Sequence, residues 1–197
     1  MVNINRALQI SPRDKRFLIL KATLHHQLGE YEQELQYLNT LLAEDPADFR
    51  LVKMKVENLV ARKLYADASA CVSRFLIHVP GHRRALLLSA RFHEQLGDMA
   101  AADRCYRAAL VQRSVSPKTA LAYAGFLIRR GNASAAADLL QETAREHPDD
   151  ASVQTLRAIT LQALGRNAEC ASILEQFIAS GHATPEIHWL LGKAYYA

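Results

Sequence analysis

The sequence predicts an all-α solenoid made of repeated pairs of helices, and three regularities support this class. A turn signal recurs at a spacing of 34 residues, led by Gly29, Gly97, Gly131 and Gly165. A proline series keeps the same spacing, at Pro12, Pro46, Pro80 and Pro148. Apolar residues between these signals fall three and four positions apart, as they do on one face of a helix. A fixed period of this length indicates stacked repeats that share one continuous core.

The first complete repeat, residues 15–48, shows the pattern that the others follow. Its first helix is predicted over about 16–28 and its second over about 31–43. Gly29 suits the left-handed residue that ends a helix, and Pro46 ends the second helix because proline disfavours helix at the residue before it. The residues predicted to face the core are Leu18, Ala22 and His25 in the first helix, and Leu35, Leu38, Leu41 and Leu42 in the second.

The same period divides the rest of the chain. Complete repeats cover 49–82, 83–116, 117–150 and 151–184, and Lys63 replaces the turn glycine in the first of these. Residues 1–14 match the second helix of a partial repeat, and residues 185–197 match the first helix of another. We therefore expect one domain over 1–197 that is a fragment of a longer array.

The apolar end over residues 185–197 needs a cover, because solenoids normally end in a polar capping element. We expect it either to continue into further repeats or to mediate self-association. The side chains expected to be uncovered are Trp189, Leu190, Leu191, Tyr195 and Tyr196.

Small side chains recur where the two helices of a repeat must approach closely. The first-helix series is Ala22, Val56, Ala90, Ala124, Ala158 and Gly192, and the second-helix series is Ala68, Ala102, Ala136 and Cys170. Glu34 breaks the second series. We expect a local tilt to carry its carboxylate to solvent; the alternative is a pair with a cation that the sequence does not identify.

The pattern of small residue, Leu-Gly, aromatic, small residue and proline resembles the tetratricopeptide repeat (TPR) family. The match is clearest over 83–116, in Ala90, Leu96-Gly97, Ala102, Tyr106 and Ala109, and over 15–48, in Ala22, Leu28-Gly29, Tyr31, Leu38 and Pro46. The chain departs from the family pattern at its early tryptophan, which is missing in every complete repeat. The resemblance implies a right-handed α-solenoid that acts as a protein-interaction scaffold.

In the TPR family, the first helix of each repeat lines a concave groove, so the resemblance assigns candidate groove residues here. The second position of four consecutive repeats is basic, in Arg16, Arg50, Arg84 and Lys118. Further groove positions hold the cations Lys53, Arg91 and Arg129 and the apolar residues Leu87, Leu88 and Leu121. Arginine grips carboxylates in a planar, bidentate way. This basic and apolar groove predicts a protein or peptide partner with acidic residues. The alternative is that the basic residues bind no partner and only form a solvated surface.

Other kinds of site are not indicated. His78 and His82 are separated by Pro80-Gly81, so they share no helical face, and a metal site needs three or four converging ligands. No phosphate-binding loop or catalytic motif is present, so we predict no cofactor and no enzymatic activity of this chain. The three cysteines are an odd number, which argues for free thiols.

Charge and hydropathy limit the partners further. The formal net charge of +4 is modest and hints only at acidic partners. Readers of single-stranded nucleic acid add stacking aromatic side chains to positive charge, and the groove offers only Trp189 and Tyr196, so nucleic acid is not expected. No apolar run approaches the roughly 18–20 residues of a membrane span.

Three functional hypotheses remain open. The first is a scaffold that holds an extended or helical partner segment in the groove. The second is a spacer or docking segment of a larger bacterial assembly, resembling exopolysaccharide-export or pilus-assembly proteins. The third is the TPR arm of a multidomain enzyme. The compartment also stays open, since free thiols suit the cytoplasm while an export protein would place the segment in the periplasm.

Overall fold

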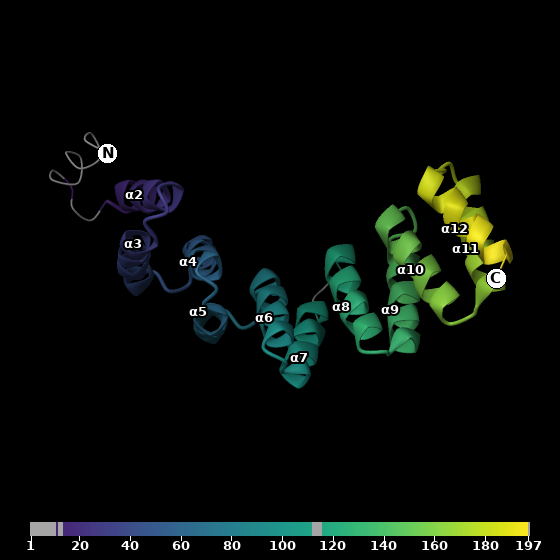
Figure 1. The fold of residues 1–197 in the computed structure, drawn as a ribbon, viewed down its shortest axis with the longest axis horizontal. Helices are drawn as coiled ribbons and strands as arrows, with labels where there is room; N and C mark the ends of the chain where they lie inside the picture. The colour runs from purple at the N-terminus through teal and green to yellow at the C-terminus, as the bar shows by residue number, and fades with distance from the viewer. Residues whose placement is uncertain (1–10, 12–13, 112–115, 197) are drawn as a thin grey trace. The chain divides into compact units, whose positions relative to one another are not determined.

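The computed structural model describes residues 11, 14–111 and 116–196, and all regular secondary structure within them is helical. Figure 1 shows the helices as a succession of hairpins. The chain divides into two compact units, residues 1–105 (unit 1) and residues 106–197 (unit 2). Each unit is described by itself.

Unit 1 contains the helices of the first two complete repeats and most of those of the third. The helices are α2 (Lys15–Gln27), α3 (Tyr31–Glu44), α4 (Phe49–Ala61), α5 (Tyr65–His78), α6 (Arg83–Gln95) and the first part of α7 (Met99–Leu110). From α2 to α6, each helix packs on the next one along the chain. The bounds of α2 and α3 differ by one residue at most from those predicted for the first repeat, and α3 ends directly before Asp45-Pro46 as expected.

Unit 2 repeats the same arrangement. Its helices after α7 are α8 (Pro117–Arg129), α9 (Ala133–Glu146), α10 (Ala151–Ala163), α11 (Asn167–Ala179) and α12 (Pro185–Tyr196). Here α10 packs not only on its neighbours in the chain but also on α8 and α12, which are the first helices of the adjacent repeats. The predicted partial repeat over 1–14 falls almost wholly outside the described residues.

The helices end at turns whose backbone conformation explains the 34-residue glycine series. Gly29, Gly97, Gly131 and Gly165 all have a positive φ, between 71° and 83°. Lys63, at the same address in its repeat, adopts the same conformation with a φ of 62°. The left-handed conformation costs a residue with a Cβ atom roughly 1–2 kcal/mol. The turn is therefore kept without glycine, at the cost of local strain.

This strain gives a testable prediction at Lys63. We expect Lys63→Gly to stabilise unit 1 by about 0.5–1 kcal/mol, because the relief of backbone strain exceeds the greater entropy of glycine in the unfolded chain. The change corresponds to a rise of roughly 1–4 °C in the thermal midpoint. Circular dichroism at 222 nm measures it.

Gly97→Lys is the matched control, since a Cβ at Gly97 would meet no atom within 4 Å and only the backbone would be strained. It should lower the midpoint by a similar amount. If Lys63→Gly leaves the midpoint unchanged or lowers it, the turn is not strained.

The first helices of the repeats begin at a second series that the sequence analysis did not identify. Asp14, Asp48 and Asp150 each accept the backbone N–H of the residue two positions later, at 2.9, 2.9 and 3.0 Å. These caps satisfy donors that the first turn of a helix leaves free. His82 fills the same position, where its Nδ1 accepts the backbone N–H of Ala85 at 3.2 Å. The spacing of 34 residues between these caps was visible in the sequence.

His82 makes this cap sensitive to acid. Its ring lies against Phe49 and Phe75, with centroids 4.2 and 5.1 Å apart. Burial lowers the pKa of His82 below its ordinary value, and the nearby charge of Arg84 acts in the same direction. The folded state thus favours the neutral ring, so its contribution is complete above the ordinary pKa of 6.5 and is lost as the pH falls through the lowered value.

We therefore expect the thermal midpoint of the wild type to fall more between about pH 7.5 and 5.5 than that of His82→Asn. Asparagine also caps helices well and does not titrate. The comparison uses the change with pH in each protein, because the loss of the ring also lowers the midpoint of the variant at neutral pH. Equal losses in both proteins would show that the His82 cap does not titrate.

The cores of the two units are built at the predicted small-residue positions. All members of both series except Gly192 are buried, and the fully buried ones are Ala22, Ala68, Ala90, Ala102, Ala124, Ala136, Ala158 and Cys170. In unit 2 the core extends to α12 through Ile187, Leu190 and Ala194. The predicted uncovered end is therefore partly wrong: Leu190 is buried and Leu191 packs against the core, while Trp189, Tyr195 and Tyr196 are exposed.

Candidate functional site

An apolar cavity in unit 1 is lined by residues of α2, α4, α5 and α6. Its volume is about 560 Å³, which is within the range of ligand-binding clefts. Most of its lining is apolar, and the polar residues of the lining are His26, Glu57, Arg91 and Gln95. The apolar lining consists of Val56, Val60 and Ala61 of α4, Tyr65 of α5, and Leu88 and Phe92 of α6.

Two of the ten predicted groove residues, Leu88 and Arg91, line this cavity directly. Leu88 is half-buried and packs against the core, whereas Arg91 is exposed. Leu88 and Arg91 are three positions apart on α6, so their side chains lie on one face of that helix. The cavity also includes Val60, Tyr65 and His26, which the sequence analysis did not propose. Leu87 is half-buried one residue before Leu88 but does not line the cavity.

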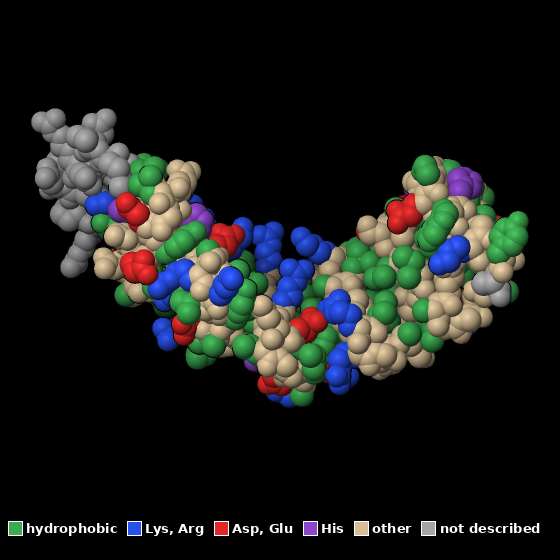
Figure 2. Space-filling view, in the orientation of Figure 1, with side chains coloured by type: hydrophobic (Ala, Val, Ile, Leu, Met, Phe, Trp, Pro, Cys, Tyr) green, Lys and Arg blue, Asp and Glu red, His purple; other side chains and the backbone are tan. Residues whose placement is uncertain are grey.

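Arg91 is the one predicted arginine that lines this cavity, and two others lie nearer the starts of α4 and α6. Arg50 and Arg84 are exposed in the first turns of α4 and α6. Neither they nor Arg91 form an ion pair with any residue that the structure describes. Figure 2 shows Lys and Arg side chains gathered over α4 and α6. Lys53 differs, since its Nζ lies 3.4 Å from the carboxylate of Glu57 on the same helix.

Arg16, unlike the other predicted arginines of unit 1, pairs with a carboxylate of its own helix start. Its guanidinium pairs with Asp14 at 2.8 Å, and the hydrogen bonds that it donates to Asp14 raise the pKa of Arg16 above its ordinary value. Its charge is therefore already matched by a neighbour, unlike that of Arg50 and Arg84. The role of Arg16 in a partner-binding groove stays a prediction.

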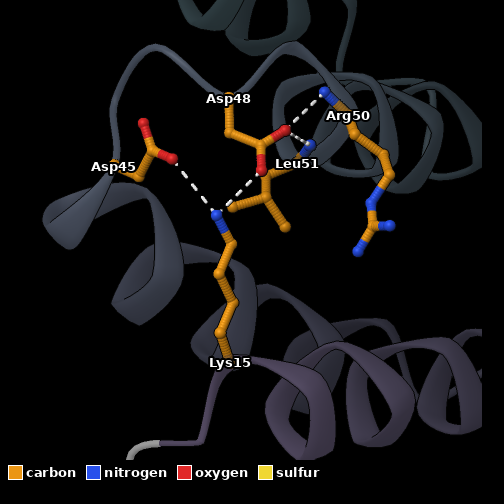
Figure 3. A network of polar contacts seen from close by, with 5 residues as sticks. All are labelled: Lys15, Asp45, Asp48, Arg50 and Leu51. Atoms are coloured by element: carbon orange, nitrogen blue, oxygen red, sulfur yellow. Dashed lines mark hydrogen bonds and ion pairs between the residues drawn. The ribbon is translucent and has the colours of Figure 1, made fainter.

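The neighbouring residue Lys15 forms a second polar network, drawn in Figure 3. Its Nζ lies 3.1 Å from Asp45 and 3.0 Å from Asp48, which also caps α4. Burial acts to raise the pKa of Asp48, but hydrogen bonds from Lys15 and from two backbone N–H groups outweigh it and lower that pKa. The network joins the start of α2 to the turn between α3 and α4. In the same view, the guanidinium of Arg50 points away from Asp48.

Unit 2 contains the other three predicted groove residues. Lys118 is exposed in the first turn of α8, Leu121 is half-buried one turn later, and Arg129 is exposed at the end of the helix. A cavity of about 590 Å³ lies farther along unit 2, between α10 and α12. Its lining includes Thr155, Ile159 and Glu186 but no lysine or arginine. A basic series that runs through four repeats stays a prediction.

The carboxylate that breaks the small-residue series, Glu34, is buried and not turned to solvent. Only 1% of its surface is exposed, so the predicted tilt is wrong. Its Oε2 accepts hydrogen bonds from Nδ2 of Asn58 and from Nδ1 of His26, both at 2.8 Å. Asn58 also donates to the backbone carbonyl of Tyr31 at 2.8 Å. A carboxylate can be buried here because two side chains satisfy it.

This network reaches the apolar cavity through His26. The ring lines the apolar cavity, while its Nδ1 is held by the buried carboxylate of Glu34. Asn58 belongs to α4 and Glu34 to α3, so the contact also joins the first repeat to the second. The alternative prediction, a cation beside Glu34, matches His26 only when that ring is protonated.

Within residues 14–111 and 116–196, no three His, Cys, Asp or Glu side chains are grouped closely enough to bind a metal ion. No described helix has both the length and the hydropathy to cross a membrane. The thiols of Cys71, Cys105 and Cys170 are free.

Comparisons with known proteins agree with this architecture. The family model of the tetratricopeptide repeat matches residues 4–49, 54–117 and 95–151. Comparison with curated protein sequences gave no match. Among solved structures, a tetratricopeptide repeat protein from Parabacteroides merdae is similar with a TM-score of 0.64 and 19% identity, over 97% of this chain and 76% of that one.

Two further structures are similar at comparable levels. YrrB, described as a TPR protein with an unusual peptide-binding site, has a TM-score of 0.65 and 14% identity, over 98% of both chains. PilW, described as a type IV pilus biogenesis factor, has a TM-score of 0.66 and 16% identity, over 96% of this chain and 88% of that one. Identities this low show the fold alone. Together with the family match and the helical hairpins, they confirm the predicted fold class: the chain belongs to the tetratricopeptide repeat family.

Proposed function

We propose that unit 1 is a protein-interaction scaffold whose α4–α6 face binds a partner segment with both acidic and apolar side chains. The observation that carries this proposal is the apolar cavity lined by Arg91, with Arg50 and Arg84 exposed in the first turns of α4 and α6. None of the three guanidinium groups has a carboxylate partner among the described residues. A bulky apolar side chain of the partner would fill the cavity. Its flanking carboxylates would then meet the arginines.

The apolar cavity and the arginines favour this partner for different physical reasons. Apolar surface that enters a cleft leaves water, which supplies most of the affinity at about 25 cal/mol per Å². Arginine at an open surface adds less affinity, but it selects carboxylates and speeds association. An extended segment and a helix can both present such side chains. The fold supports this reading, since YrrB is described as having a peptide-binding site.

The spacer and enzyme-arm hypotheses remain predictions. The likeness to PilW is one of fold and brings no pilus function to this chain. The proposal assigns no catalytic role to any residue of this chain. It extends to Lys118, Leu121 and Arg129 of unit 2 only as further candidates for contact with a longer partner.

A selection from a display library of random peptides of about 12 residues tests the proposal. We expect the selected peptides to combine Asp or Glu with large apolar residues. They should bind the wild type and lose binding to Leu88→Asp, which places a charge in the cavity. Selection of basic or uniformly polar peptides would contradict the proposal.

Ile77→Asp is the matched control for this selection. Ile77 is 76% exposed on α5 and does not line the cavity, so the same chemical change there should leave the binding of the selected peptides intact. Circular dichroism verifies that both variants remain helical. If Leu88→Asp binds the peptides as well as Ile77→Asp does, the cavity is not the binding site.

A further inference from the structure

A second cavity in unit 1 lies on another face of the same repeats. It has a volume of about 520 Å³ and is formed by α3, α4 and α5. Lys55 of α4 lines it, while Glu57 of α4 lines the apolar cavity described above. Two positions along a helix correspond to a rotation of about 200°, so the two side chains leave α4 on opposite sides. The second cavity is therefore independent of the proposed binding groove.

The walls of this cavity combine apolar surface with cations. Leu42, Val52 and Phe75 supply much of the apolar part, and Lys55, Arg74 and His78 supply the basic side chains. None of the lining residues is an aspartate or a glutamate. A concave surface with charges of one sign and apolar walls concentrates ligands of the opposite sign.

The two principal cations keep their charge uncompensated among the described residues. Lys55 donates a hydrogen bond to Oδ1 of Asn39 at 2.6 Å, but that amide is neutral. Arg74 forms no ion pair with a described residue. Both side chains also border a smaller adjoining cavity of about 240 Å³, where Asp67 is the one acidic side chain of the lining.

The pKa of the half-buried Cys71 thiol responds to the charges that line the cavity. Burial raises the pKa of Cys71, while the charges of Lys55 and Arg74 act in the opposite direction. Both cations are thus close enough to act on a group in the cavity wall. The raised pKa also means that the thiol is mostly protonated and is not itself an activated nucleophile.

We propose that this cavity binds a small organic anion, in which a carboxylate, sulfonate or phosphate group is joined to an apolar body. The anionic group would lie between Lys55 and Arg74, and the apolar body would rest on Leu42, Val52 and Phe75. Because the lining comes from α3 and α5 as well as α4, a bound ligand would link the first two repeats and stabilise their stacking by mass action. This site goes beyond the proposed partner groove and does not depend on it.

Protection of Cys71 from alkylation tests the site directly. The protein carries Cys105→Ser and Cys170→Ala, so that Cys71 is its one cysteine. Alanine is the residue that other repeats hold at the position of Cys170. Iodoacetamide modifies the thiol at about pH 8.5, and mass spectrometry follows the rate. The probe is 8-anilinonaphthalene-1-sulfonate, and N-phenyl-1-naphthylamine is the matched compound that lacks the sulfonate.

We expect the sulfonate probe at saturation to slow alkylation of Cys71 by about fivefold or more, and the neutral compound by less than about twofold. Lys55→Gln with Arg74→Gln should reduce the protection by the sulfonate to less than about twofold. The ratio with and without probe is compared within each protein, because these substitutions also change the basal reactivity of the thiol.

Arg84→Gln is the matched control, since it removes an exposed cation from the other face and should leave the protection intact. Three results would overturn the proposal: no protection by the sulfonate, equal protection by both compounds, or full protection in the Lys55→Gln, Arg74→Gln protein. Each can be read whether or not the groove binds peptides.

Discussion

Replacement of Asn58 by leucine is expected to lower the free energy of unfolding by about 2–4 kcal/mol. Asn58 is fully buried and donates hydrogen bonds to the carboxylate of Glu34 and to the carbonyl of Tyr31. Leucine fits the position by size and hydropathy, because the corresponding positions of other repeats hold Leu24 and Phe92. The loss therefore comes from a buried carboxylate left with one hydrogen-bond donor, and not from a poor shape.

The same reasoning predicts that Glu34→Ala rescues Asn58→Leu. Alanine is what the second-helix series holds at Ala68, Ala102 and Ala136. With the carboxylate removed, leucine no longer leaves a buried charge unsatisfied, and the stability of the double variant should approach that of the wild type. A coupling energy of about 2 kcal/mol or more is expected from the double-mutant cycle.

Urea unfolding followed by circular dichroism measures the four proteins of this cycle. His26, whose side chain is 42% exposed, can turn to water once Glu34 is gone, so it adds little cost to the double variant. Additive effects of the two substitutions would contradict the account, because they would show that Asn58 stabilises the fold independently of the carboxylate.

The second large effect concerns binding. Arg50→Glu together with Arg84→Glu should weaken the binding of a selected acidic peptide by about 100-fold or more, since two attractions become repulsions near an apolar surface. Fluorescence anisotropy of the labelled peptide measures the dissociation constants. The wild-type affinity should also fall as the salt concentration rises, because salt screens the attraction between exposed charges. The Debye length is about 10 Å at 0.1 M ionic strength and shortens as salt is added.

Lys55→Glu with Arg74→Glu is the control for this experiment. It reverses the same number of charges on the other face of unit 1, so any effect of net charge alone would appear there as well. We expect the peptide affinity of the control to stay within about threefold of the wild type at 0.15 M salt. Equal losses in both double variants would mean that the arginines at α4 and α6 form no specific contacts.

Most of the fold could be predicted because the sequence period reports burial. Each repeat places the same small residues between its helices, so Ala22, Ala90 and Ala158 are buried alike. The positions of the turns were equally predictable, because Lys63 adopts the left-handed conformation that glycine adopts at this position in the other repeats. Here the packing of the neighbouring helices outweighs a local preference, as tertiary contacts often do.

The fate of single polar side chains could not be predicted in the same way. Glu34 is satisfied by Asn58, which lies 24 residues away in the next repeat, and no periodic signal links the two. The pairing of Arg16 with Asp14 likewise depends on the conformation of the residues before α2. The cap series at Asp14, Asp48 and Asp150 is different, because its spacing was present in the sequence and could have been found.

Photochemical cross-linking tests the central claim, the position of the partner on unit 1, most directly. A selected peptide carries p-benzoylphenylalanine in place of its apolar anchor, and mass spectrometry locates the adducts on the protein after irradiation. We predict adducts on side chains that line the α4–α6 cavity, with Val60, Tyr65 and Leu88 among them. Adducts confined to the face of Lys55 and Cys71, or to α12, would contradict the account.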